Sequence, residues 1–173
     1  EGFLFPDTYD FDRHATPLAN AQRMVAEFEQ RLPQDAVERA RSLGMTIAEV
    51  VTVASLVERE AKADGERALM AGIYYHRLQM KMPLEVDAAI EYALPTHHAV
   101  ITKSDLALDS PYNTYRYQGL PPTPIANPGA ASLHAAFFPQ ASPYLYYVYR
   151  GGGHHAFART LEEQQANITR YLK

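Results

Sequence analysis

The sequence predicts a mainly helical α+β domain with a small antiparallel β-sheet or hairpin. Apolar residues recur at spacings of three and four over most of the chain, which is typical of helices that pack on a core. Near the C-terminus, two strand-like runs flank Gly151-Gly152-Gly153, which predicts a hairpin. A length of 173 residues suits one domain, so we expect residues 1–173 to form a single unit.

The first third of the chain predicts a short strand and then two helices. Residues 1–11 form the strand-like segment. Thr16 and Pro17 suit the N-cap and first position of a helix that Pro33 ends. A shorter helix follows and ends at Gly44.

The helix that follows is the most informative element. Thr46 and Glu49 have the spacing of a capping box, which predicts a helix over about 47–63. Its almost wholly apolar run ends in Glu58 and Glu60. A carboxyl group at the end of a buried helix lies partly in the core, where a raised pKa and acid/base chemistry are easily arranged.

The middle of the chain predicts two more helices and a long loop. One helix covers about 66–81, and Asp87 is a plausible N-cap for a shorter helix ending near Leu94. Residues 109–129 are punctuated by Pro and Gly but are not highly charged, which favours a binding loop over disorder.

The C-terminal third completes the predicted fold. Tyr residues cluster at 112–117 and 144–149, where they could pack in strands or present rings to a ligand. The remaining predicted elements are a helix between Pro128 and Pro139, a strand pair over 144–150 and 155–157, and a final helix that starts at Thr160.

Composition excludes several functional classes. The net charge of −4, without a long basic run, disfavours nucleic-acid binding. The chain has no cysteine, which excludes disulfides and thiol chemistry. No apolar stretch reaches the length of about 18 residues that a membrane-spanning helix needs.

The histidines do not predict a metal site. His97-His98 and His154-His155 are adjacent pairs, and sequence neighbours rarely point at one ion. We interpret both pairs as loop or turn residues, and we expect no metal and no cofactor. No G-x-S-x-G motif is present, so serine hydrolase chemistry has no support.

Spacing separates the two glutamates. Glu58 has Lys62 four residues later, a favourable pair on a solvent-facing helix surface. Glu60 extends the apolar face and has Asp64 at the same spacing, which is unfavourable on an open surface. The sequence therefore favours Glu60 over Glu58 as the catalytic carboxyl.

Several blocks of sequence together carry a family resemblance. The chain resembles the catalytic domain of the endolytic murein transglycosylases, the YceG-like family, over essentially its whole length. The blocks lie in the family's order at residues 1–9, 54–60, 77–87, 110–115, 119–129, 143–146 and 152–154.

The resemblance implies a lysozyme-like, lytic-transglycosylase catalytic fold and cleavage of peptidoglycan glycan strands. The bond would be that between N-acetylmuramic acid and N-acetylglucosamine, with a 1,6-anhydro end as product. One glutamate acts first as acid and then as base, a role that we assign to Glu60, with Glu58 as the alternative. Related lytic enzymes usually have Ser or Thr next, where this chain has Ala61.

The resemblance also implies substrate-binding residues. Tyr112, Asn113, Thr114 and Tyr115 match the family's Y-N-T-Y block and are expected to line the sugar cleft with Asp87. Asp87 also remains possible as a simple helix cap.

The cellular setting is likewise implied by the resemblance. The family typically has one N-terminal transmembrane helix and a LysM-like subdomain, which residues 1–173 lack, so we expect this chain to be a fragment. The expected location is the bacterial inner membrane, with the catalytic domain facing the periplasm or extracytoplasmic space. Cell-wall synthases, the penicillin-binding proteins, are the expected protein partners.

Two alternatives remain open from the sequence. One is a hydrolytic muramidase that uses Glu60 with Asp87 as second carboxylate, because paired carboxylates serve most glycosidases. The other is a peptidoglycan-binding module without activity.

Overall fold

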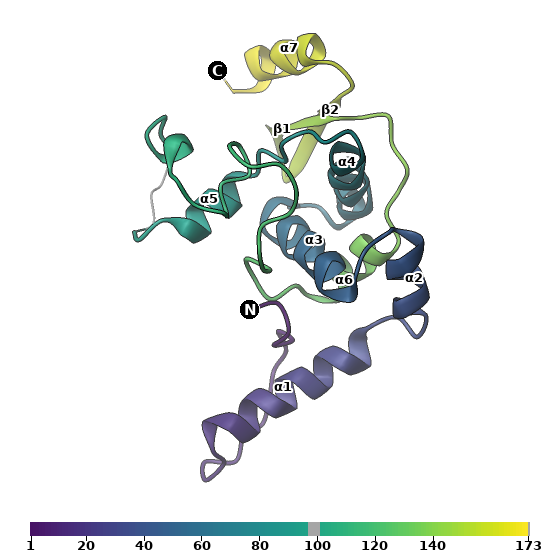
Figure 1. The fold of residues 1–173 in the computed structure, drawn as a ribbon, viewed down its shortest axis with the longest axis vertical. Coiled ribbons are helices and arrows are strands. Elements are labelled where there is room, and N and C mark those ends of the chain that lie inside the picture. The colour runs from purple at the N-terminus through teal and green to yellow at the C-terminus, as the bar shows by residue number, and fades with distance from the viewer. Residues whose placement is uncertain (97–100, 173) are drawn as a thin grey trace.

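The protein is a helical domain with one small β-hairpin at its edge, as Figure 1 shows. The computed structural model describes residues 1–96 and 101–172. Within them the elements are α1 (Pro17–Arg31), α2 (Ala36–Ser42), α3 (Ile47–Glu60), η1 (Asp64–Glu66), α4 (Arg67–Gln79), α5 (Asp87–Ala93), η2 (Asp105–Ala107), α6 (Ala130–Phe137), β1 (Tyr146–Gly151), β2 (His154–Ala158) and α7 (Leu161–Tyr171). The predicted α+β class is confirmed.

Helix α3 is the centre of the core. Every residue from Val50 to Val57 is buried, so the helix has no solvent face over two turns. It packs against α6 and α4, and α5 contacts it near its C-terminal end. Burying one large side chain such as Leu56 contributes about 1.5–3 kcal/mol, so this packing fixes the position of the helix firmly. A rigid helix is a suitable mount for whatever side chains end it.

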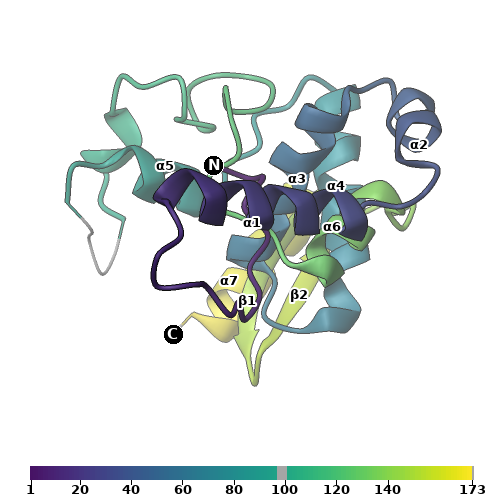
Figure 2. The same ribbon diagram turned by 90° about the horizontal axis from the view of Figure 1, so that it is seen from below.

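The β-hairpin lies beside this core and carries α7 on its outer side, as Figure 1 shows, and Figure 2 shows the turn of the hairpin at the lower edge of the molecule. Strands β1 and β2 pair antiparallel, with Tyr147 opposite Phe157 and Tyr149 opposite His155. The turn uses Gly151, whose positive φ of 95° suits a residue without a side chain. The strand pair predicted from the sequence is therefore confirmed.

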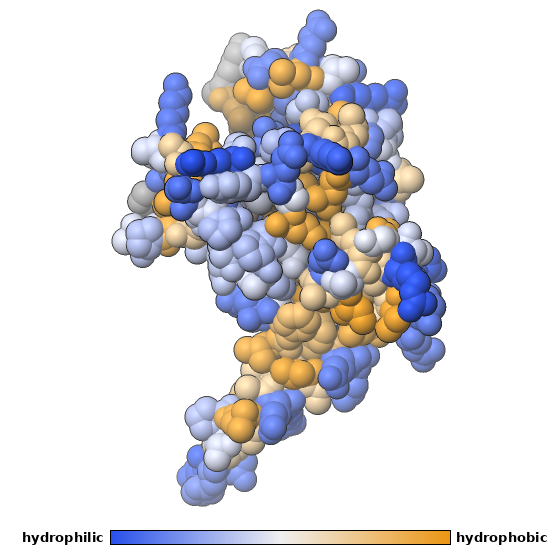
Figure 3. Space-filling view, in the orientation of Figure 1, coloured by the Kyte–Doolittle hydropathy of each residue, from blue (hydrophilic) through white to orange (hydrophobic). Residues whose placement is uncertain are grey.

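Helix α1 projects from the body as an arm, which Figure 3 shows at the bottom of the molecule. Its start is as predicted, because the Thr16 side chain accepts a hydrogen bond from the backbone N–H of Ala19. Phe28, near its C-terminal end, is its one buried residue. The arm therefore contributes to the core through one end and does not shape the cleft described below.

Three local predictions differ from the structure. Residues 1–11 form no strand, because Oδ1 of Asn127 accepts hydrogen bonds from the backbone N–H groups of Gly2 and Leu4. The helix predicted over 47–63 ends at Glu60, because Ala61 has an extended backbone. Asp87 is the first residue of α5 and not its N-cap, which is Val86 and makes no side-chain cap hydrogen bond.

Two further predictions concern His97-His98 and the membrane. The histidine pair lies outside the described residues. In residues 1–96 and 101–172, no single helix has the length and apolar character needed to cross a membrane. The pair α2 and α3 reaches the criterion only jointly, across a bend of 84°.

Candidate active site

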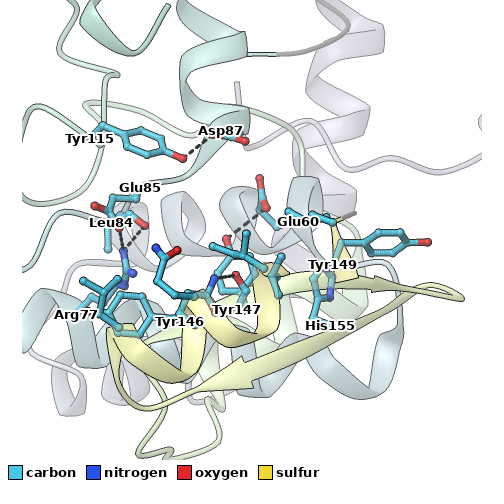
Figure 4. Close-up of a pocket in the computed structure, with 16 residues that line it drawn as sticks. Glu60, Arg77, Leu84, Glu85, Asp87, Tyr115, Tyr146, Tyr147, Tyr149 and His155 are labelled. Atoms are coloured by element: carbon cyan, nitrogen blue, oxygen red, sulfur yellow. Dashed lines mark hydrogen bonds and ion pairs between the residues drawn. The ribbon is translucent and has the colours of Figure 1, made fainter. Parts of the chain in front are cut away.

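Glu60 ends α3 with its carboxyl group turned out of the core (Figure 4). Its Oε2 accepts a hydrogen bond from the Tyr147 hydroxyl at 3.3 Å, and its Oε1 accepts one from the backbone N–H of Ala88 at 3.4 Å. Both hydrogen bonds are long, so neither holds the carboxyl tightly. The carboxyl is held in place from two sides and still has capacity to donate or accept a proton.

The surroundings of Glu60 raise its pKa above the ordinary carboxyl value of 4.5. Burial is the largest cause, since a low dielectric disfavours the charged form, and the nearby charge of Asp87 adds to it. The hydrogen bonds from Ala88 and Tyr147 and the influence of His155 act in the opposite direction but do not cancel the rise. Glu60 therefore keeps its proton to a higher pH than an exposed glutamate, as a general acid requires.

Two cavities meet at Glu60. One has a volume of about 440 Å³ and extends between α5 and α7, and the other, of about 610 Å³, extends toward the start of α5 and the loop before α6. The residues that line both are Glu60, Asp87, Tyr149 and His155. Cavities of this size are typical of ligand sites, so Glu60 lies at the midpoint of an extended cleft.

The wall opposite the hairpin is formed by Tyr115 and Asp87 (Figure 4). The Tyr115 hydroxyl donates to Oδ1 of Asp87 at 2.6 Å, a short bond of the kind made to charged acceptors. Burial, and then the Asp87 contact, raise the pKa of Tyr115, so this phenol stays protonated as a donor. The pair fixes both a ring and a carboxylate beside the cleft.

The floor of the first cavity is organised by Arg77, which is buried. Its guanidinium donates to the backbone carbonyls of Leu145, Pro83 and Leu84 and to the carboxylate of Glu85 at 3.0 Å. Glu85 has a positive φ of 54°, an uncommon conformation for a residue with a side chain. Arg77 therefore ties the hairpin to the segment that precedes α5, across the cavity.

A chain of hydroxyl groups supports Glu60 from below. The Tyr74 hydroxyl lies 2.9 Å from the Tyr147 hydroxyl, which in turn donates to Glu60. Tyr74 is fully buried, and burial keeps the pKa of both phenols well above 10. Both tyrosines are thus neutral donors, and Tyr147 is fixed in place by α4.

Glu58 has a different environment. Its Oε2 accepts hydrogen bonds from the Ser132 hydroxyl at 2.6 Å and the backbone N–H of Gly129 at 3.2 Å, and Arg67 lies at 3.6 Å. The carboxylate therefore caps the start of α6 and joins it to α4. The expected pairing with Lys62 at helical spacing is absent from the structure, because α3 ends before that residue.

The residues of the block at 112–115 also differ in environment, and two of them are buried within the fold. Asn113 is completely buried and closes its own loop, donating to the carbonyls of Leu106 and Leu108. Thr114 is buried and accepts from the backbone N–H of Val86.

The two tyrosines of the block also differ. Tyr112 packs on the ring of Tyr92 at 5.0 Å and contacts Thr123 away from the first cavity, whereas Tyr115 lines that cavity. The structure thus brings together Glu60, Asp87 and Tyr115, and it places the other members of the block in supporting positions around Tyr115.

Sequence reasoning assigned no site role to several residues of the cleft, among them Tyr147, Tyr149, His155 and Arg77. The tyrosine cluster at 144–149 carried a partial signal, because alternation along a strand puts Tyr147 and Tyr149 on one face. His155 was predicted to start the second strand of the hairpin but to have only a loop or turn role; it is the second residue of β2, it is buried, and it lines both cavities. In the described part of the chain, no group of three or more His, Asp or Glu side chains could hold a metal ion.

A single desolvated carboxyl at the midpoint of an extended cleft defines a general acid/base site on a helical scaffold. The comparisons with known proteins agree with this class and name the family. Residues 1–170 match the model of the YceG-like family, so the chain belongs to that family.

Two kinds of relatives support the assignment. Curated proteins named endolytic murein transglycosylase share 35% identity over 172 residues in Bacillus subtilis and 32% over 178 residues in Streptococcus pneumoniae strain D39. Each alignment covers 99% of this chain but only 48% and 32% of the relative, so the chain spans about half of their length or less. A crystal structure of a yceG-like protein from Listeria monocytogenes matches with a TM-score of 0.87 and 35% identity, over 95% of this chain and 54% of that one.

Proposed function

We propose that this chain is a peptidoglycan lytic transglycosylase domain that cleaves the bond between N-acetylmuramic acid and N-acetylglucosamine within glycan strands. The observation that carries the proposal is the Glu60 carboxyl, which is desolvated, protonated to a raised pH and open to cavities on both sides. The names of the relatives in Bacillus and Streptococcus support the substrate.

The proposed reaction uses one protein carboxyl twice. Glu60 donates its proton to the glycosidic oxygen as the bond from that oxygen to the anomeric carbon breaks, which leaves an oxocarbenium-like sugar. The 6-hydroxyl of the same muramic residue then bonds to the anomeric carbon, and its proton returns to the Glu60 carboxylate. The product is a 1,6-anhydro ring, and no water enters the balance.

The geometry suits both halves of this cycle. Burial favours the acid form of Glu60, and the donors Tyr147 and Ala88 each face one oxygen of its carboxylate form. Asp87, across the junction, places a negative charge where positive charge develops on the sugar. Tyr115 and Tyr149 line the cleft on the two sides of that point and provide rings for sugar faces.

One observation favours a second candidate, a hydrolytic muramidase. Asp87 shares the junction with Glu60 and raises the pKa of that residue, as the second carboxylate of a hydrolase would. In this reaction Asp87 assists a water molecule that attacks the anomeric carbon, and the product has a reducing muramic end.

Product analysis separates the two reactions. Purified glycan strands are incubated with the protein and the released fragments are analysed by mass spectrometry. Anhydro-muramic ends, which are lighter by one water, support the lytic reaction, and reducing ends overturn it in favour of hydrolysis. If wild type and Glu60→Gln both bind strands and neither cuts them, the protein is a binding module.

The setting in the cell is also a proposal. We place the domain on the outer side of the bacterial inner membrane, because its proposed substrate is assembled there, and cell-wall synthases are its proposed partners. Labelling of an introduced surface cysteine by a membrane-impermeant reagent in intact spheroplasts tests the first point. Co-purification with penicillin-binding proteins after crosslinking tests the second.

A further inference from the structure

A carboxylate and two adjacent histidines form a cluster at the hairpin end of the cleft. Glu66, the last residue of η1, reaches β2 and accepts hydrogen bonds from the backbone N–H of His155 at 3.2 and 3.1 Å. Nδ1 of His155 lies 2.8 Å from Oε2 of Glu66, and Nδ1 of His154 lies 3.1 Å from Oε1. Both carboxylate oxygens of Glu66 are therefore contacted by residues of β2.

The two histidines have opposite exposure. The His154 side chain is 51% exposed and lines neither cavity at the junction, whereas the His155 side chain is only 5% exposed and lines both. The His155 ring lies against the rings of Tyr147 and Tyr149, at centroid distances of 5.6 and 5.7 Å. Only His155 is thus built into the cleft, and Figure 4 shows it on the hairpin side of Glu60.

The charge on Glu66 fixes the state of the imidazole. Partial burial by itself raises the pKa of Glu66, but the hydrogen bonds from His155 and His154 outweigh burial and leave that pKa below its ordinary value. Glu66 is therefore an ionised acceptor at neutral pH, so Nδ1 of His155 carries a proton. In the described residues, Nε2 of His155 makes no hydrogen bond.

We propose that Glu66 and His155 form a buried carboxylate–imidazole pair that acts on Glu60 as a positioning unit. His155 lies across the junction from Asp87 and against the Tyr147 ring, whose hydroxyl donates to Glu60. The groups that face Glu60 are Asp87 from α5, Tyr147 from β1 and His155 from β2. Asp87 disfavours the Glu60 carboxylate, and His155 favours it. The pair thereby stabilises the base form of Glu60 that follows proton donation.

This inference rests on the proposed function for its role in turnover, but its first test does not require activity. The titration of the Glu60 side-chain carboxyl is followed by ¹³C NMR in wild type, His155→Gln and the matched control His154→Gln. Removing His155 removes the influence that lowers the pKa of Glu60, so the midpoint rises by about 0.5–1 pH units. His154→Gln also loses a contact with Glu66 but leaves the midpoint unchanged.

A second variant guards against simple misfolding. Glu66→Gln keeps an acceptor for Nδ1 but loses the charge, so the Glu60 midpoint moves in the same direction by a smaller amount, with the backbone fold checked by circular dichroism. A Glu60 midpoint that stays constant in both His155→Gln and Glu66→Gln overturns the proposal, whatever the effect on stability.

Kinetics then connect the pair to the reaction. If the protein cuts glycan strands, the basic limb of the kcat/KM profile moves to higher pH in His155→Gln, because it reports the acid form of Glu60. A shifted NMR midpoint without any cleavage in wild type supports the pair and contradicts the proposed function, so the two failures are distinguishable. An unshifted basic limb in an active variant removes the role in turnover.

Discussion

Glu58 and Glu60 end the same buried helix two residues apart and both line the second cavity, yet their carboxyl groups have different partners. The Glu58 carboxylate faces the junction of α6 and α4, where the Ser132 hydroxyl, the backbone N–H of Gly129 and the Arg67 guanidinium all contact its Oε2. Glu60 faces the junction of the two cavities, where its two hydrogen bonds are both longer than 3.2 Å and Asp87 lies on the opposite side. The number and closeness of the partners, and not burial alone, distinguish the two carboxyl groups.

The difference teaches how to separate a structural from a reactive carboxyl. A carboxylate with a short hydrogen bond from a hydroxyl and further donors on the same oxygen joins elements of the fold. A carboxyl that is desolvated but weakly partnered holds its proton and can give it away. The first should affect stability when it is changed, and the second should affect turnover.

The largest expected effect is on turnover in Glu60→Gln. The amide keeps the shape and the hydrogen-bond positions but cannot transfer a proton, so the initial rate on glycan strands falls by about 10²–10⁴-fold. The rate of release of soluble fragments measures this loss. A rate within threefold of wild type would contradict the role given to Glu60.

The next largest effect is on stability in Glu58→Ala. Loss of this carboxylate leaves the N–H of Gly129 and the Ser132 hydroxyl without their acceptor, which costs about 1–3 kcal/mol of folding free energy. Denaturant unfolding followed by circular dichroism measures the change. An unaltered midpoint of unfolding would mean that the contact of Glu58 with α6 does not contribute to stability.

A smaller effect is expected in Tyr147→Phe, which removes one donor to Glu60 and leaves the ring. The hydrogen bond is long at 3.3 Å, so its loss costs about 1 kcal/mol in the reaction, a decrease of about fivefold in kcat. Steady-state kinetics with KM determined separately test this. A decrease confined to KM would instead assign Tyr147 to substrate binding.

The smallest effect is a pH dependence of stability. Because the pKa of Glu60 is higher in the folded state than the ordinary 4.5, the protonated group favours folding below that value. This contribution is lost as the pH rises through the folded-state pKa of Glu60. Glu60→Gln cannot titrate, so the Tm of the variant minus that of wild type should increase from pH 4 toward neutral pH.

Thermal unfolding at matched ionic strength records that increase. A Tm difference that stays constant across this range would show that Glu60 is not desolvated in solution.

Sequence reasoning predicted the helices better than the cleft. Helical periodicity and the Thr46–Glu49 capping box act through neighbours in the chain, and both features are present in the structure as expected. The strand predicted at residues 1–11 was wrong, because Asn127, far away in sequence, binds that backbone instead. Local patterns cannot predict a long-range partner of this kind.

The site follows the same rule. Glu60 could be singled out because the apolar helix that it ends is a local feature. The expected Asp64 spacing is absent from the structure, since α3 ends at Glu60 and Asp64 pairs with Arg67. Tyr147 and His155 could not be singled out, because only the packing of the hairpin against α3 and α4 brings them to the carboxyl. The roles of the residues expected to bind substrate stay predictions, with Tyr115 and Asp87 in the cleft and Asn113 inside its loop.

The central claim, that the carboxyl facing the cleft performs the chemistry while its neighbour holds the fold, is tested most directly by one paired measurement. Glu60→Gln and Glu58→Gln are incubated with purified glycan strands at equal concentrations of folded protein, and the products are quantified by mass spectrometry. We predict that Glu58→Gln releases at least about 10²-fold more product than Glu60→Gln. Equal yields, or a greater loss in Glu58→Gln, would contradict the account.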